Sequence, residues 1–208
     1  MSGTLCSFGF MDVRRRCLVS VNIVLLDYSV VVGGIWLVRF VEDCDFREFV
    51  EYLRRVGLYE RKEDLDELRE KIAAKRINLI VWREDDEIVG HAIWHESSAS
   101  EHRKGDPRDR DDREILERLC GGKRDFVELH EVWLDENYRG RGYGKQFFPF
   151  FEDYIRRKGY DAIVYYAYHP AALTVCRQRG YKEAYGLQLT GPKGEIATCY
   201  VFFLRVKI

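Results

Sequence analysis

The sequence lacks several features that would assign it to a functional class at once. Its 208 residues carry a formal net charge of −1, so no basic surplus suggests a nucleic-acid partner. Its six cysteines include no C-x-x-C pair, and no cluster of cysteine and histidine has zinc-ligand spacing. We therefore predict no metal site and a reduced, cytoplasmic protein. No internal repeat is visible, and 46% hydrophobic with 33% charged residues is typical of a globular chain.

The N-terminal part has no apolar run long enough to cross a membrane. The basic stretch Met11–Arg16 and the apolar stretch Cys17–Leu26 resemble a signal peptide, but Asp27 ends the apolar stretch. A membrane span needs about 20 apolar residues, and no small-residue cleavage site follows. We therefore expect no membrane association. We interpret residues 1–33 as an N-terminal extension, which is an irregular segment or misassigned start, an extra strand, or a targeting segment.

Hydrophobic periodicity from residue 35 onwards predicts strands and helices in a defined order. Asp45 is placed to cap the first helix, and Gly57 and Gly180 stand where helices stop. Residues 96–125, rich in charges of both signs, form an inserted segment. The order predicts a mixed α/β sheet in a single domain over residues 34–208. The predicted strands are 35–40, 77–83, 87–95, 126–134, 161–168, 187–190 and 196–206, and the predicted helices are 46–56, 62–75, 145–158 and 170–179.

A glycine-rich turn stands between the strand predicted at 126–134 and the helix predicted at 145–158. It reads Arg-Gly-Arg-Gly-Tyr-Gly over residues 139–144. Glycines let backbone N–H groups approach an anion closely, and a helix start adds N–H donors and a partial positive charge. The spacing is neither that of a dinucleotide fold nor that of a P-loop. The turn predicts a site for a pyrophosphate-bearing ligand, with an ordinary strand-to-helix turn as the alternative.

This turn and the element order resemble the GNAT superfamily, the acyl-CoA-dependent N-acyltransferases. Arg139, Gly142 and Gly144 fit the signature (Q/R)-x-x-G-x-(G/A), which in that family follows a strand and a short acidic turn. The resemblance covers about residues 35–206. It implies six to seven mostly antiparallel strands, about four helices, and a central parallel pair of strands that splays apart at the CoA site.

A second motif of the family lies at residues 169–181. Ala172, Gly180 and Tyr181 match the pattern N-x-x-A-x-x-x-Y-x-x-x-G-(F/Y). His169 replaces the asparagine of that pattern, and Cys176 replaces its tyrosine. Two motifs at the right separation carry more weight than either motif alone.

The resemblance implies acetyl-CoA as the cosubstrate. Backbone N–H groups of the glycine turn would hold the pyrophosphate, and the edge of the preceding strand would pair with the pantetheine arm like an added strand. His169 would contact the pantetheine or cap the helix that follows it. The implied binding residues are Val132, Trp133, Leu134, Arg139, Gly140, Arg141, Gly142, Tyr143, Gly144, Lys145 and His169.

Acyl transfer from a thioester requires a neutral amine, which a general base helps to provide. Counting back from Arg139, Glu128 matches the general-base glutamate of the histone-acetyltransferase branch. Glu131 and His130 are alternatives in the same strand, and an ion-paired structural role is the other interpretation of all three. The glutamate that other branches carry in the next strand is replaced here by Val164.

The leaving thiolate must take up a proton or tolerate its charge. Cys176 stands where many relatives carry the tyrosine that donates this proton, so it is our candidate acid, with a buried structural cysteine as the alternative. Tyr165, Tyr166 and Tyr168 are further candidates, unless they pack as core aromatics. Departure of the thiolate without a donor also stays open.

We therefore predict an N-acetyltransferase that moves an acetyl group from acetyl-CoA to a primary amine by direct, base-assisted attack. The acceptor is a small molecule or a protein, and homodimers are common among relatives. Carboxylates of the inserted segment, such as Asp106 and Asp109, would attract a cationic amine, but neighbouring arginines nearly cancel their charge. The alternatives are a CoA-binding regulatory or interaction module without turnover, and a protein that binds another nucleotide diphosphate.

Overall fold

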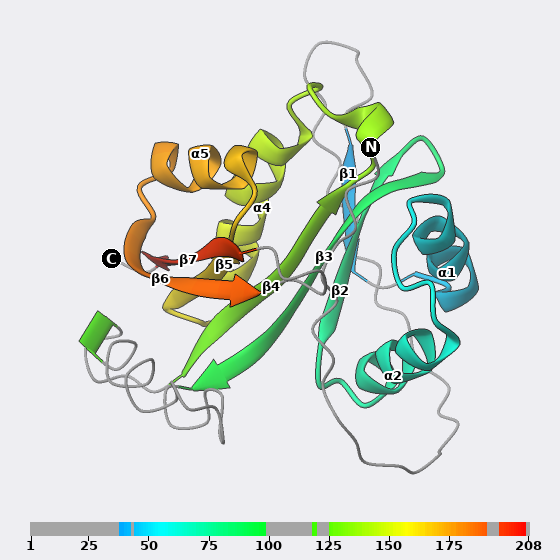
Figure 1. Ribbon diagram of the computed structural model, residues 1–208, viewed down its shortest axis with the longest axis horizontal. Helices are drawn as coiled ribbons and strands as arrows, with labels where there is room; N and C mark the ends of the chain where they lie inside the picture. Colours follow the sequence, from blue (N-terminus) through cyan, green and yellow to red (C-terminus); the bar gives the residue numbers. More distant parts are fainter. Residues whose placement is uncertain (1–37, 43, 99–117, 120–124, 191–195, 207–208) are drawn as a thin grey trace. The chain divides into compact units, whose positions relative to one another are not determined.

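The computed structural model describes residues 38–42, 44–98, 118–119, 125–190 and 196–206. The N-terminal extension and most of the inserted segment, including Asp106 and Asp109, lie outside these residues. The described part confirms the predicted order of elements (Figure 1). The elements are β1 (Arg39–Glu42), α1 (Phe46–Arg55), α2 (Lys62–Ala73), β2 (Asn78–Glu84), β3 (Glu87–Ser98), β4 (Asp125–Leu134), the 3-10 helix η1 (Glu136–Tyr138), α4 (Tyr143–Arg157), β5 (Ala162–Ala167), α5 (Pro170–Gln178), β6 (Lys182–Thr190) and β7 (Ile196–Arg205).

The strands form one seven-stranded sheet in the order β1-β2-β3-β4-β5-β7-β6. The pairs β1–β2, β5–β7 and β6–β7 are antiparallel, whereas β4 and β5 are parallel. The parallel register runs from Val127 opposite Ile163 to Leu129 opposite Tyr165. It ends there although β4 continues to Leu134 and β5 to Ala167. The predicted mostly antiparallel sheet with a central parallel pair is confirmed.

Several element boundaries differ from the sequence prediction by one to five residues, and two of these differences have a clear cause. Strand β6 begins at Lys182 rather than at residue 187, because β7 pairs with it along almost its whole length, with a register shift between Glu183 and Tyr185. Its start was missed because Lys182, Glu183 and Gly186 are not typical strand residues. Helix α4 begins at Tyr143, since the left-handed Gly142 directly precedes it as the N-cap.

The described residues group into two compact units. The first takes the residues up to His91 together with Trp133–Asn137, and the second takes residues 92–132 and those from Tyr138 onwards. In the first unit, Asp45 caps α1 as predicted, because its Oδ1 accepts a hydrogen bond of 2.8 Å from the backbone N–H of Arg47. The rings of Phe49 and Tyr52 on this helix contact the buried His91 of β3.

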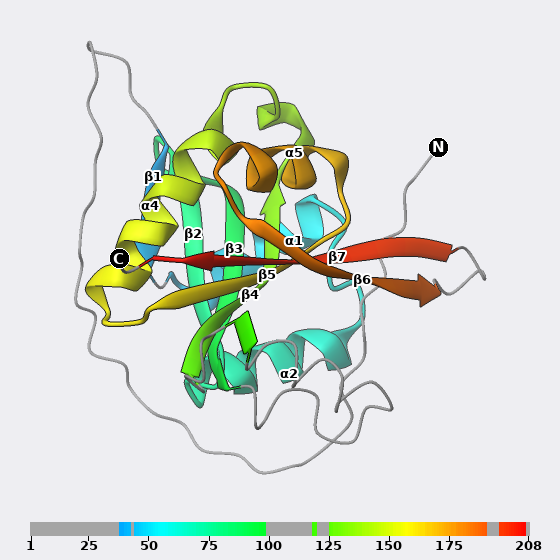
Figure 2. The ribbon, with the colours of Figure 1, turned by 90° about the vertical axis from the view of Figure 1, so that its left-hand side faces the viewer.

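In the second unit, α4 and α5 lie on one face of β5 (Figures 1 and 2). Phe148 of α4 packs against Tyr165 of β5, with ring centroids 5.7 Å apart, and Trp94 of β3 packs against Phe151 of α4. A second apolar cluster contains residues of β4, β5 and β7 that alternate with those facing α4. Its buried members are Phe126, Ala162, Val164, Cys199, Val201 and Phe203, with Tyr166 and Tyr185 packed against them.

Two further properties bear on the sequence predictions. In the described part of the chain, no helix is long and apolar enough to cross a membrane. Among the described cysteines, Cys44, Cys176 and Cys199 form no disulfide.

Candidate active site

The turn between β4 and α4 has a backbone shape that permits close contact with an anion. Gly140 and Gly142 both have φ of +83°, in the left-handed region that favours glycine. Within the described chain, no side-chain hydrogen bond caps α4 at Gly142. A Cβ atom added at Gly140, Gly142 or Gly144 would meet no described atom within 4 Å. The turn therefore leaves open space beside its backbone, and the binding of a phosphate group there stays a prediction.

Three cationic side chains surround this turn. Arg139, Arg141 and Lys145 are all exposed. The guanidinium of Arg141 lies 4.6 Å from the ring centroid of Tyr138, a cation–π contact that keeps the charge close to the turn. The first turn of α4 contains no acidic residue, so no carboxylate there offsets the positive end of the helix dipole. The local charge favours an anionic ligand.

A buried aspartate fixes the chain where β4 ends. The Oδ1 atom of Asp135 accepts hydrogen bonds from the backbone N–H and the side-chain amide of Asn137, at 2.9 and 3.1 Å. Its own N–H donates to the carbonyl of Val89 at 2.9 Å, and Nε of Arg55 lies 3.7 Å from Oδ2. The sequence pattern predicted only a short acidic turn here. The Asp-x-Asn spacing, which is typical of an Asx-turn, was the signal that could have identified this role.

The last part of β4 carries the residues expected beside the pantetheine arm. Val132, Trp133 and Leu134 are half-buried. A Cβ atom at Gly90 of β3 would lie 2.7 Å from the carbonyl oxygen of Trp133, so glycine is needed there for the backbones to approach. The contacts of these three residues with pantetheine stay a prediction.

Glu128 lies on β4 opposite Val164 of β5, one residue before the parallel register ends. Its side chain is 7% exposed. Val164, where other branches carry a glutamate, is fully buried in the apolar cluster. The structure thus places a buried carboxylate next to the point where the pairing of the two strands stops. The role of general base stays a prediction.

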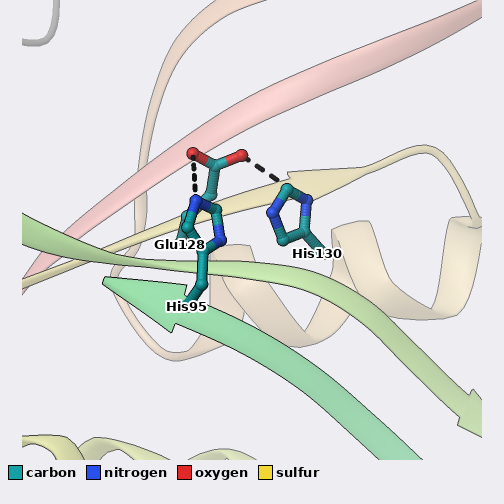
Figure 3. Close-up of side chains that lie close together, drawn as sticks. All are labelled: His95, Glu128 and His130. Atoms are coloured by element: carbon teal, nitrogen blue, oxygen red, sulfur yellow. Dashed lines mark ion pairs between the residues drawn. The ribbon is translucent and has the colours of Figure 1, made fainter. Parts of the chain in front are cut away.

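Two histidines lie beside this carboxylate (Figure 3). Nε2 of His95, on β3, is 3.9 Å from Oε2 of Glu128, and Nδ1 of His130, on β4, is 3.5 Å from Oε1. The two imidazole rings stack, with centroids 4.4 Å apart and planes at 12°. His130 was among the predicted candidates, but His95 was not, because the cluster combines residues of two strands that spacing along the chain does not relate.

The candidate proton donors differ in burial. Cys176 is fully buried, and burial above all, with the charge of Glu152, raises the pKa of its thiol to about 12. Burial also raises the pKa of Tyr165 well above its usual value, with smaller contributions from Cys176, Tyr168, Cys199 and Glu131. Both groups are therefore weak acids in this environment. Tyr168 is 49% exposed, and Tyr166 is half-buried.

His169 begins α5. Its Nδ1 accepts a hydrogen bond of 3.3 Å from the backbone N–H of Ala171, and Pro170 occupies the first helical position. The capping role that the sequence suggested is therefore present. A contact between His169 and pantetheine stays a prediction.

Comparison with known proteins identifies the family. The profile of the Acetyltransferase (GNAT) family matches residues 41–181, more than half of the chain. Among curated proteins, the sequence has no match.

Three solved structures illustrate the fold. A polyamine N-acetyltransferase of Drosophila melanogaster is 13% identical, with a TM-score of 0.58 over 81% of this chain and 99% of the other. The mosquito protein named "arylalkylamine N-acetyltransferase like 5b" is 14% identical, with a TM-score of 0.58 over 81% of this chain and 100% of the other. An N-acetyltransferase of Staphylococcus aureus Mu50 is 14% identical, with a TM-score of 0.57 over 82% and 99%. At these identities the similarity supports the fold, and the profile match supports the conclusion that this chain belongs to the GNAT acetyltransferase family.

Proposed function

We propose that the protein is an N-acetyltransferase that moves an acetyl group from acetyl-CoA to a primary amine. Family membership supports the cosubstrate, and the open glycine turn is suited to its pyrophosphate. One observation carries the catalytic part of the proposal. This is the buried carboxylate of Glu128, on β4 next to the end of its pairing with β5.

For the cosubstrate, we propose that the N–H groups of the first turn of α4 bind the pyrophosphate. The left-handed Gly140 and Gly142 shape this turn, and Arg139, Arg141 and Lys145 add positive charge around it. The edge of β4 at Val132, Trp133 and Leu134 would pair with the amides of pantetheine. Acetyl-CoA supplies the thioester that is attacked.

The chemistry requires removal of a proton from the amine. An alkylamine has a pKa of about 10.4, so presenting it neutral at pH 7 costs roughly 4–5 kcal/mol. We propose that Glu128 accepts this proton, directly or through one water molecule. The amine nitrogen forms the new bond to the carbonyl carbon, the carbon–sulfur bond breaks, and the sulfur leaves as the thiolate of CoA, which is then protonated.

The burial of Cys176 argues against this residue as the source of that last proton. Burial raises the pKa of its thiol to about 12, from a usual value of about 9. Proton transfer from Cys176 to a CoA thiolate of ordinary pKa would then be uphill by roughly 4 kcal/mol. Although its position in the motif made Cys176 the candidate acid, we propose that the thiolate leaves without its help and is protonated by solvent or by the exposed Tyr168.

The first experiment is an acceptor screen that follows CoA release with a thiol reagent. The names of the structural neighbours suggest polyamines, agmatine and arylalkylamines as the first panel. Peptides with a free N-terminus or a lysine form the second panel. The proposal predicts steady CoA release with at least one amine. Tight CoA binding without turnover on both panels would instead favour the regulatory module, and a thermal shift with NAD or ATP but not with CoA would favour another nucleotide.

The general base is tested by Glu128→Gln, with Glu131→Gln as the matched control on the same strand. Loss of a general base lowers the rate by roughly 100-fold or more. We expect this deficit near pH 7 and a smaller one near pH 10, where the amine is increasingly neutral without assistance. Glu131→Gln should retain the wild-type profile. An equal deficit at all pH values would remove Glu128 from the role of base.

A further inference from the structure

We propose that His95, Glu128 and His130 form a binding site for a divalent transition-metal ion, and that an ion bound there blocks acetyl transfer. The first part depends only on the geometry of the three side chains. The second part rests on the proposed function, because it requires Glu128 to act as the base.

The three residues supply the right ligand types. One nitrogen of each histidine and one carboxylate oxygen all lie within 4.8 Å of one another. Two imidazoles and one carboxylate are a ligand set that holds zinc in enzymes and leaves a fourth position open. Magnesium and calcium prefer oxygen ligands, whereas imidazole suits zinc, copper and nickel. The chemistry therefore favours Zn²⁺ over Mg²⁺ or Ca²⁺.

The distances show how far the site must close around an ion. Bonds of about 2.0–2.1 Å to a tetrahedral zinc place neighbouring ligand atoms about 3.3 Å apart. The nitrogen–oxygen distances of 3.5 Å from His130 and 3.9 Å from His95 end on different oxygens of Glu128, so with one oxygen as the ligand at least one histidine must move closer to it. The stacked rings must tilt toward each other, because the lone pair of an imidazole lies in the ring plane. His130 is 36% exposed, so its ring has space to make this movement.

Electrostatics also favour a cation at this position. The Glu128 carboxylate is 7% exposed, and a buried carboxylate loses much of the stabilisation that water gives it. A dication between the three ligands would replace part of that stabilisation. Its charge would also lower the basicity of the carboxylate, so that Glu128 in the metal-bound enzyme is a poor base for the acceptor.

Calorimetric titration of Zn²⁺ into the full chain tests the site directly. CoA is left out, because its thiol also binds zinc. We expect one equivalent of zinc to bind and no heat from Mg²⁺. His95→Gln and His130→Gln should each weaken zinc binding by roughly 100-fold, since loss of a ligand costs at least as much as the 10–100-fold typical of outer-shell residues. His169→Gln, which removes another exposed histidine, should leave zinc binding unchanged.

His130→Gln is the decisive variant, because its partly exposed side chain makes a folding defect the smallest concern. Zinc binding of wild-type strength in His130→Gln would overturn the proposal, and so would the absence of zinc binding to the wild-type chain. The first result would mean that zinc binds elsewhere, for example at a cysteine.

The blocking effect is measured once an acceptor is known. Zinc should inhibit the wild type in the same concentration range in which it binds, a chelator should restore activity, and His130→Gln should need roughly 100-fold more zinc for the same inhibition. Full turnover at saturating zinc would overturn the blocking effect while leaving the site intact. If no amine is acetylated, the calorimetric result still decides whether the site exists, so the two proposals fail separately.

Discussion

Exchanging Gly142 for alanine separates the backbone requirement of the glycine turn from simple crowding. Gly142 has φ of +83°, and a Cβ atom there would meet no described atom within 4 Å. The cost of Gly142→Ala therefore comes from the backbone conformation, which disfavours a residue with a Cβ atom by about 1–2 kcal/mol. The loss should appear as a lower free energy of unfolding with no change in the packed core.

Gly144 is the matched control. It lies inside α4, and a Cβ atom there also enters open space. Alanine in a helical conformation loses less chain entropy on folding than glycine, so Gly144→Ala should raise stability by up to about 1 kcal/mol. The two variants should thus differ by about 1–3 kcal/mol, or roughly 2–12 °C in Tm for a chain of this length.

Thermal unfolding and CoA titration together test this reasoning. We expect Gly142→Ala to have the lower Tm and the weaker CoA binding, because a strained turn would re-aim the N–H groups that face the pyrophosphate. Gly144→Ala should bind CoA like the wild type, since the family signature accepts alanine at that position. Equal Tm shifts for both variants would refute the left-handed conformation of Gly142, and unchanged CoA affinity in Gly142→Ala would refute its role in the cradle.

Two other residues give independent predictions. Burial raises the pKa of Cys176 to about 12 from the usual 9, so at pH 8 the native protein holds about 1000-fold less Cys176 thiolate than the unfolded chain. Alkylation of Cys176 in the native protein should therefore be slower than in urea by at least that factor. Labelling within tenfold of the unfolded rate would contradict the burial. The raised pKa also makes the free energy of unfolding depend on pH, because above about pH 9 the unfolded chain loses the Cys176 proton while the native protein keeps it. The contribution of this thiol to stability is complete below about pH 9 and decreases by up to about 1.4 kcal/mol per pH unit as the pH rises toward 12. Denaturant titrations at pH 8 and 11 would measure this decrease. Cys176→Ala should keep the acetylation rate within about threefold of wild type, because so weak an acid is a poor proton donor, and a larger loss would restore the acid role. Asp45→Ala removes the N-cap of α1 and should lower the free energy of unfolding by about 1 kcal/mol, and a loss below about 0.3 kcal/mol in a urea titration would contradict that role.

The elements that were predicted well from the sequence are those whose identity depends on residues close together in the chain. Asp45 precedes an amphipathic stretch, so its capping role follows from neighbouring residues alone. Strand β6 was predicted too short because its first half has weak strand residues and becomes a strand through pairing with β7. Tertiary contact overrides local preference there.

The candidate site shows the same division between local and long-range signals. Glu128 and the glycine turn could be found by counting along one segment. His95 could not, because its position beside Glu128 depends on which strand neighbours β4 in the sheet. The prediction of no metal site rests on spacing along the chain only, and such spacing cannot reveal a cluster assembled from two strands.

Glu128 occupies a position that stability alone would not select. It lies on the strand face of the buried Phe126 and opposite the buried Val164. Replacement of a whole buried ion pair by apolar residues is often neutral or stabilising by about 1–4 kcal/mol, whereas removal of one partner costs about 3–5 kcal/mol when the other stays buried and charged. The side chains of His95 and His130 are 24% and 36% exposed, so neither remains fully buried when the carboxylate is removed. We therefore expect Glu128→Leu to unfold at the same or a higher denaturant concentration than the wild type, while losing the base-dependent acetylation and the zinc binding proposed above. If Glu128→Leu instead lost about 3 kcal/mol or more, as happens when a buried charge network is broken, the carboxylate would be a structural partner of His95 and His130, and its burial would no longer support a catalytic role.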